Sequence, residues 1–127
     1  MSPHVLEFAL VGLGGAIGAM SRHGVTYLGV FDDNPYYYTV AINLSGCLII
    51  GIFTAFFLHY DFSRLWSLFF SVGVLGGYTT YSSFTRDAIE LVEKGDMGTA
   101  LLYIAITMVG GLGACFLGLV GTQHLLK

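Results

Sequence analysis

The stretch GGYTTYSSF, residues 76 to 84, follows an uncharged apolar run that begins near residue 65. A membrane-spanning helix would be expected to continue there. Glycine tolerates non-helical dihedral angles, and threonine side chains compete for backbone hydrogen bonds. Two glycines followed by two threonines therefore predict a break near residues 76–80. Irregular backbone at membrane depth is tolerated only where it is buried or lines a cavity, so the break is either a kink or a cation site built from carbonyl oxygens.

The composition places the rest of the chain in a membrane as well. Of its 127 residues, 55% are hydrophobic and only 10% are charged, whereas a soluble domain carries about a quarter charged residues. The net charge is −3, and the five Lys and Arg residues form no cluster. We therefore expect lipid as the surrounding medium and no nucleic-acid partner.

Four stretches are long and apolar enough to span a bilayer, which requires about 20 residues. They cover about residues 5–30, 36–58, 65–93 and 97–119, and the third contains the break. Short connections make neighbouring helices antiparallel. We expect one all-α, four-span membrane domain, residues 1–127, with both ends on the same side.

Small residues recur at helical spacing in the first and last of these stretches. Gly14 and Gly18 are four residues apart, and Gly110, Ala114 and Gly118 form a longer series. Small residues let helix backbones approach closely in lipid. We interpret both series as helix-packing faces.

Polar side chains inside a bilayer need a partner or a function. Asn43 is either a helix–helix hydrogen bond or a donor to a permeating anion. Tyr103 and Thr107 share a helix face and either line a polar path or join helices. Arg22 is either paired near a helix end or supplies positive potential to an anion entrance.

Aromatic and hydroxyl side chains follow the break. Tyr81 and Phe84 are three residues apart on one face, with Ser82 and Ser83 between them. The edge of an aromatic ring is positive, so it can face an anion without trapping it. Together with hydroxyl and amide donors, these rings suit a small, strongly hydrated anion that must enter and leave.

Three motifs, in order, resemble the Fluc fluoride channels, also called the CrcB family. They are GGAIGAMSR at 14–22, NLSG at 43–46 and GVLGGYTTYSSF at 73–84. The resemblance covers essentially the whole chain. It implies a membrane channel that exports fluoride passively and protects the cell from fluoride toxicity.

The resemblance also implies an antiparallel, dual-topology dimer with two pores and a central structural sodium ion. The carbonyl oxygens of Gly76 and Thr79, from both subunits, would bind the sodium. The pore residues would be Asn43, Tyr81, Phe84, Ser82, Ser83, Tyr103 and Thr107. The partner would be a second copy of the chain or a close paralogue.

The chain departs from the family pattern at three positions. Tyr81 stands where phenylalanine is usual, Ser83 where threonine is usual, and His23 where tyrosine is typical. Some relatives pair two different subunits with partly degenerate pores. Tyr81 leaves that arrangement open, whereas Asn43 and Phe84 argue for a working pore.

Other functions explain the sequence less well. A small four-span multidrug exporter coupled to protons is the main alternative, but it needs a carboxylate near mid-membrane, and Glu7 is too near the end of its span. A purely structural membrane protein leaves the break beside an aromatic pair unexplained. No nucleophile, base and metal constellation indicates an enzyme.

Charge near the span ends bears on orientation. Two basic residues, Arg64 and Lys127, are expected on the side of the membrane that carries both chain ends. Three, Arg22, Arg86 and Lys94, are expected on the opposite side. A difference of one charge is a weak bias. We therefore expect the chain to insert in both orientations and to pair antiparallel.

Overall fold

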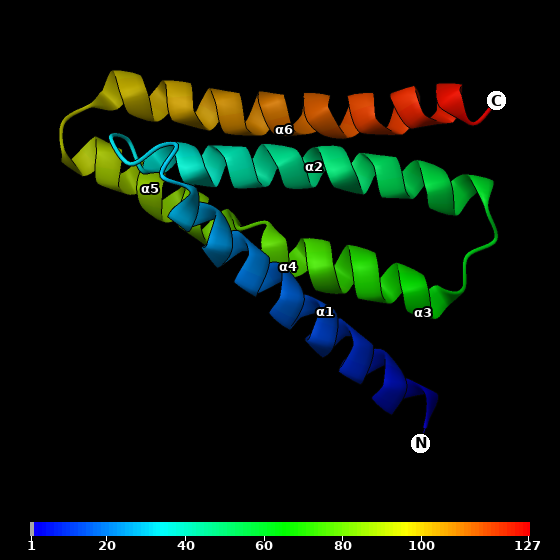
Figure 1. The fold of residues 1–127 in the computed structure, drawn as a ribbon. Helices are drawn as coiled ribbons and strands as arrows, with labels where there is room; N and C mark the ends of the chain where they lie inside the picture. Colours follow the sequence, from blue (N-terminus) through cyan, green and yellow to red (C-terminus); the bar gives the residue numbers. More distant parts are fainter. Residues whose placement is uncertain (1) are drawn as a thin grey trace.

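The computed structural model describes residues 2–127, and these residues are helical with no strand. Three helices are long and apolar enough to cross a membrane: α1 (Pro3–Val25), continued by the 3-10 turn η1 (Thr26–Leu28), α2 (Tyr36–His59) and α6 (Met97–Leu125). Figure 1 shows α2 and α6 side by side, with both chain ends at the same end of the molecule.

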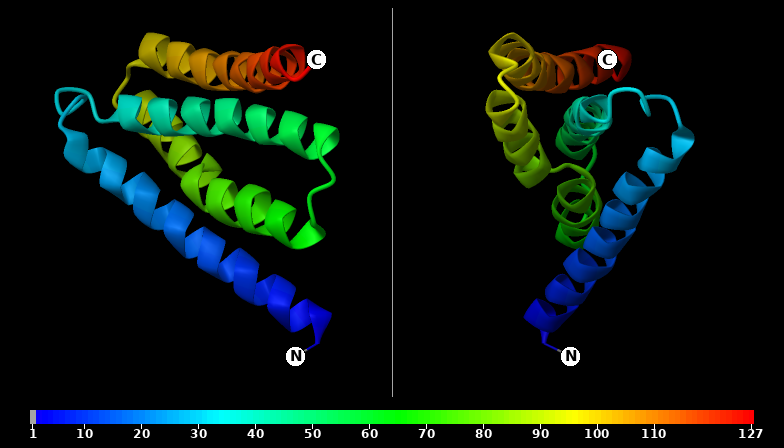
Figure 2. Two further views of the ribbon diagram at one scale, coloured as in Figure 1. Left: turned by 45° about the vertical axis from the view of Figure 1, so that its right-hand side comes forward. Right: turned by 90° about the vertical axis from the view of Figure 1, so that its left-hand side faces the viewer.

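The remaining apolar stretch is divided into short elements. These are α3 (Arg64–Ser67), the π-helix η2 (Leu68–Leu75), α4 (Gly76–Tyr78) and α5 (Tyr81–Glu93). Between α4 and α5 the backbone is extended, with ψ 156° at Thr79 and φ −147° at Thr80. Figure 2 shows the change of direction between the green elements α3 to α4 and the yellow-green α5.

Polar turns connect the helices. Gly95 has φ 80°, a conformation that favours glycine, and Asp96 then caps α6 by accepting a hydrogen bond from the Thr99 N–H at 3.1 Å. In the turn after η1, the Asn34 N–H donates to the Phe31 carbonyl at 2.9 Å. Both turns reverse the chain at the same end of the bundle (Figure 1).

Glycines bring the helix backbones into close contact. A side chain at Gly14 or Gly18 would overlap the backbone of η2 and α4, and one at Gly118 would overlap the Leu48 carbonyl of α2. These contacts confirm both packing faces predicted from the small residues. A separate apolar core lies between α2, α5 and α6, and consists of Val40, Phe84, Ala88, Leu91, Ala100 and Tyr103.

Candidate functional site

Threonine hydroxyls form additional hydrogen bonds with the backbone at the extended residues 79 and 80. The N–H and the hydroxyl of Thr79 both donate to the Leu75 carbonyl at 3.0 Å. The Thr80 hydroxyl accepts from the Ser83 N–H at 3.1 Å and so caps the start of α5. The local sequence therefore satisfies much of its own irregular backbone.

Asn43 of α2 pairs with the backbone of Thr80 on both sides of its amide. Its Oδ1 accepts from the Thr80 N–H at 2.7 Å, and its Nδ2 donates to the Thr80 carbonyl at 3.0 Å. All of these groups are buried. Of the two roles left open by the sequence, the structure shows the helix–helix bond, and one Nδ2 hydrogen has no acceptor among residues 2–127.

This pairing frees carbonyl oxygens in the preceding turn. In a continuous helix the Thr80 N–H would donate to the Gly76 carbonyl, but here it is held by Asn43. Within residues 2–127, no donor contacts the carbonyl of Gly76 or of Thr79. Unpaired backbone oxygens are the ligands that a hard cation such as sodium prefers, so these two residues fit the expected cation site.

Arg22 of α1 contacts the same segment. Its Nε donates to the Gly77 carbonyl at 3.2 Å, in a partly buried position. The side chain also lines an open cavity between the helices. The structure therefore provides a partner for Arg22 and keeps it beside the cavity.

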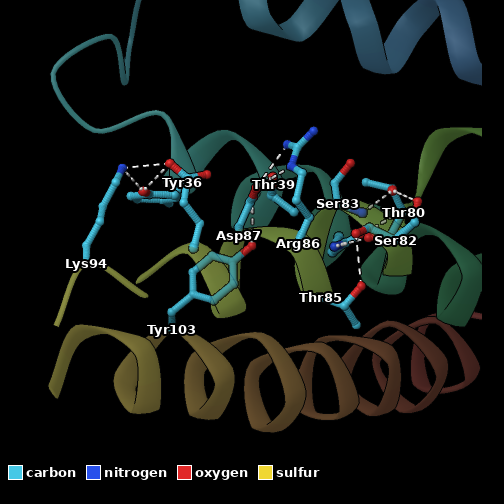
Figure 3. Close-up of polar contacts among 12 residues, drawn as sticks. Tyr36, Thr39, Thr80, Ser82, Ser83, Thr85, Arg86, Asp87, Lys94 and Tyr103 are labelled. Atoms are coloured by element: carbon cyan, nitrogen blue, oxygen red, sulfur yellow. Dashed lines mark hydrogen bonds and ion pairs between the residues drawn. The ribbon is translucent and has the colours of Figure 1, made fainter. Parts of the chain in front are cut away.

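That cavity has a volume of about 830 Å³ and opens among α1, α2 and α5. Three basic side chains line it, Arg22, Arg86 and Lys94, together with the acidic Asp32, Asp87 and Glu90. Thr80 and Ser83 lie at its wall, so the cavity reaches the interruption between α4 and α5, the extended residues 79 and 80. Figure 3 shows part of this lining, namely Thr80, Ser83, Arg86, Asp87 and Lys94.

Lys94 sits at the rim of the cavity, just beyond α5. Its Nζ donates to Glu90 at 2.6 Å and to the Tyr36 hydroxyl at 2.8 Å. The hydrogen bond to Glu90, followed by that to Tyr36, raises the pKa of Lys94 above its ordinary value. Lys94 therefore stays protonated at neutral pH and forms an ion pair with Glu90 at the rim.

Three aromatic rings meet beside the cavity. Phe84 is buried, and its ring centroid lies 5.5 Å from that of Tyr81 and 5.6 Å from that of Tyr103. Tyr81 itself is 76% exposed. The structure thus brings the predicted pair together with Tyr103, although only Phe84 and Tyr103 are enclosed within one chain.

Asp87 was overlooked by the sequence argument, which considered only Glu7 as a membrane carboxylate. It is 4% exposed and accepts hydrogen bonds from Thr39 at 2.7 Å, Tyr103 at 3.1 Å and Arg86 at 2.9 Å (Figure 3). A signal was present, because Asp87 lies three residues after Phe84 on the face that also carries Ala88 and Leu91.

The predicted hydroxyl groups differ in their surroundings. The Thr107 hydroxyl is buried with no partner among residues 2–127, one turn from Tyr103, whose own hydroxyl is bonded to Asp87. Ser82 is exposed, and its hydroxyl lies 3.3 Å from the hydroxyl of Thr80. Ser83 faces the cavity.

Known proteins resemble this chain over nearly its whole length. The family described as CrcB-like protein, Camphor Resistance (CrcB), matches residues 9–119. A fluoride-specific ion channel FluC of Acidobacterium capsulatum is 37% identical over 91% of this chain and 94% of its own. The FluC of Dichelobacter nodosus is 39% identical over 87% and 92%, and FluC 1 of Listeria monocytogenes is 37% identical over 91% and 96%.

Proposed function

Because this chain belongs to the CrcB family, we propose that it is a fluoride-selective channel that lets fluoride leave the cell passively and so protects against fluoride toxicity. Similarity over 91% of the chain to a protein named as a fluoride-specific ion channel carries this conclusion. The chain is a multi-pass cell-membrane protein, and it acts as a channel rather than as an enzyme.

Fluoride enters from water through the cavity that Arg22, Arg86 and Lys94 line. Beyond it lie Ser83 and the ring of Phe84, which offer a hydroxyl donor and a positive ring edge without a fixed full charge. Such weak, multiple contacts allow an anion to enter and also to leave.

Two further hydrogen-bond donors are available to fluoride in the pore. Asn43 has one Nδ2 hydrogen beyond its bond to Thr80, and the buried Thr107 hydroxyl has no partner within the described chain. Tyr103 contributes its ring rather than its hydroxyl, which donates to Asp87. Ser82 and Tyr81 complete the pore from a surface that the single chain leaves open.

A second copy of the chain covers that surface. Gly76, Tyr81 and Ser82 are all exposed beside the interruption, although backbone and hydroxyl groups facing hydrocarbon are costly. An antiparallel dimer places two such surfaces together around one axis in the membrane plane. It requires the elements from α3 to α5 to form one interrupted span, so that the chain crosses the membrane four times and inserts in both orientations.

A sodium ion at the dimer centre is bound by the carbonyl oxygens of Gly76 and Thr79 from both subunits. The diversion of the Thr80 N–H to Asn43 supports this assignment, because it leaves the Gly76 oxygen without its helical partner. When bound, the ion supplies a positive charge that holds carbonyl dipoles of the two chains together.

The multidrug-exporter alternative needs a carboxylate that exchanges protons. Glu7 is ion-paired with Arg64 at 2.8 Å, and Asp87 accepts bonds from three side chains. Both carboxylates are already engaged by neighbouring side chains, so the structure offers no support for that function.

Efflux from liposomes that contain only the purified chain tests the proposal. We expect fluoride to leave under its own gradient, chloride to remain, and protein-free liposomes to release neither. Equal release of both anions, or release that requires a proton gradient, would contradict a fluoride channel. Activity that appears only after a related second chain is added would retain the channel and replace the homodimer by a heterodimer.

A further inference from the structure

The carbonyl groups of residues 76–80 fall into two sets. The Gly77 oxygen accepts from Arg22 at 3.2 Å, and the Thr80 oxygen accepts from Asn43 at 3.0 Å. Within residues 2–127, the carbonyls of Gly76, Tyr78 and Thr79 have no recorded donor. Two side chains from different helices, α1 and α2, therefore occupy some carbonyls of the interruption and leave others free.

The packing of α1 explains how Arg22 reaches this segment. Gly14, Gly18 and Arg22 lie on successive turns of one face, and both glycines contact the backbone of η2 or α4. Gly77 packs against the backbone of Gly15 so closely that a side chain there would overlap it. The guanidinium group is consequently held beside the Gly77 carbonyl by the helix packing.

We propose that Arg22 is a positioning residue that keeps the Gly77 carbonyl out of the cation shell and thereby sets the preference for sodium over larger cations. This inference rests on the proposed cation site. Its ground is that the Nε–H of Arg22 occupies the Gly77 oxygen in the single chain, before any cation or second copy is added. The role differs from the anion entrance that the sequence indicated for Arg22.

The contact between Arg22 and the Gly77 carbonyl affects cation preference through the number of oxygen ligands at the site. Selectivity among hard cations follows cavity size, ligand number and flexibility. Losing Arg22 leaves the Gly77 oxygen without its donor, so one further carbonyl per chain becomes available to a bound ion. A larger and more flexible set of oxygens favours potassium relative to sodium.

The test measures the stability of the full-length dimer in detergent, not its flux. Dimer fraction and thermal midpoint are titrated with NaCl or KCl, with choline chloride keeping the ionic strength constant. In Arg22→Met, which retains the stem but loses donor and charge, we expect the ratio of half-stabilising potassium to sodium concentrations to fall about tenfold. Because both cations are compared within one variant, a general loss of stability cancels.

Three further proteins sharpen the result. Arg22→Lys retains a charged donor and should keep the wild-type ratio, whereas Arg22→Leu, which lacks any donor and is measured in parallel should Arg22→Met not assemble, should lower it. Lys94→Met removes a charge from the same cavity without a carbonyl contact and should leave the ratio unchanged. An unchanged ratio in Arg22→Met, or in Arg22→Leu where only that variant assembles, overturns the inference alone. A wild-type dimer indifferent to both cations overturns it together with the proposed cation site.

Discussion

Replacing Asn43 should destabilise the protein as well as stop transport. In Asn43→Ala, the Thr80 N–H and carbonyl both lose their partner, at 2.7 and 3.0 Å, in a buried position. Each unsatisfied backbone group costs about 1–3 kcal/mol, so the two together cost roughly 2–6 kcal/mol. In Asn43→Asp, an oxygen still accepts from the Thr80 N–H, but the other carboxylate oxygen faces the Thr80 carbonyl oxygen, and the buried charge is unpaired.

The measurement combines thermal unfolding of the purified dimer with fluoride efflux from liposomes. Both Asn43 variants should unfold at clearly lower temperature and lose efflux. Ser45→Ala is the matched control, because Ser45 lies two residues along α2 and its hydroxyl contacts, to the Ile42 carbonyl at 3.1 Å and the Tyr78 hydroxyl at 3.0 Å, are only partly buried. Its cost should be about 1 kcal/mol. A wild-type unfolding temperature for Asn43→Ala, with efflux lost, would refute the structural role and leave only a pore donor.

Three other substitutions test the aromatic pair, the buried carboxylate and a helix cap. Phe84→Ile should reduce fluoride efflux about tenfold, since a ring contact is worth up to about 1.5 kcal/mol, whereas Tyr81→Phe should change it little; the reverse order would give the Tyr81 hydroxyl a pore role. Asp87→Asn should reduce efflux more than Tyr103→Phe does, because it disturbs the hydrogen bonds of three side chains rather than of one, and equal effects would argue against Asp87 as the organising group. Asp96→Ala should lower the thermal midpoint at neutral pH. The hydrogen bonds to Thr99 lower the pKa of Asp96 below its ordinary value of 3.8, so this difference should be full above that value and vanish as the pH falls through the folded-state pKa; a difference that persists in acid would exclude the ionised cap.

Local patterns in the sequence were sufficient for much of the secondary structure and for the packing faces. Three of the predicted apolar stretches overlap the long helices, although α6 continues to Leu125, beyond the predicted end at 119, and the small residues of α1 and α6 contact neighbouring backbones as their spacing predicted. The extended backbone at Thr79 and Thr80 lies within the glycine–threonine stretch. Each of these features follows from residue type and from a period of a few residues, which a single sequence displays directly.

The partners of the polar side chains were decided only by the tertiary structure. Asn43 meets Thr80 across 37 residues of chain, and Arg22 meets Gly77 across 55. Helical periodicity shows that Asn43, Arg22 and Asp87 each lie on some face of a helix, but not which backbone or side chain that face meets. Asp87 becomes a buried acceptor only because α5 packs against both α2 and α6. A hydrogen bond depends on positions within a few tenths of an ångström, and those positions are fixed by the packing of all the helices together.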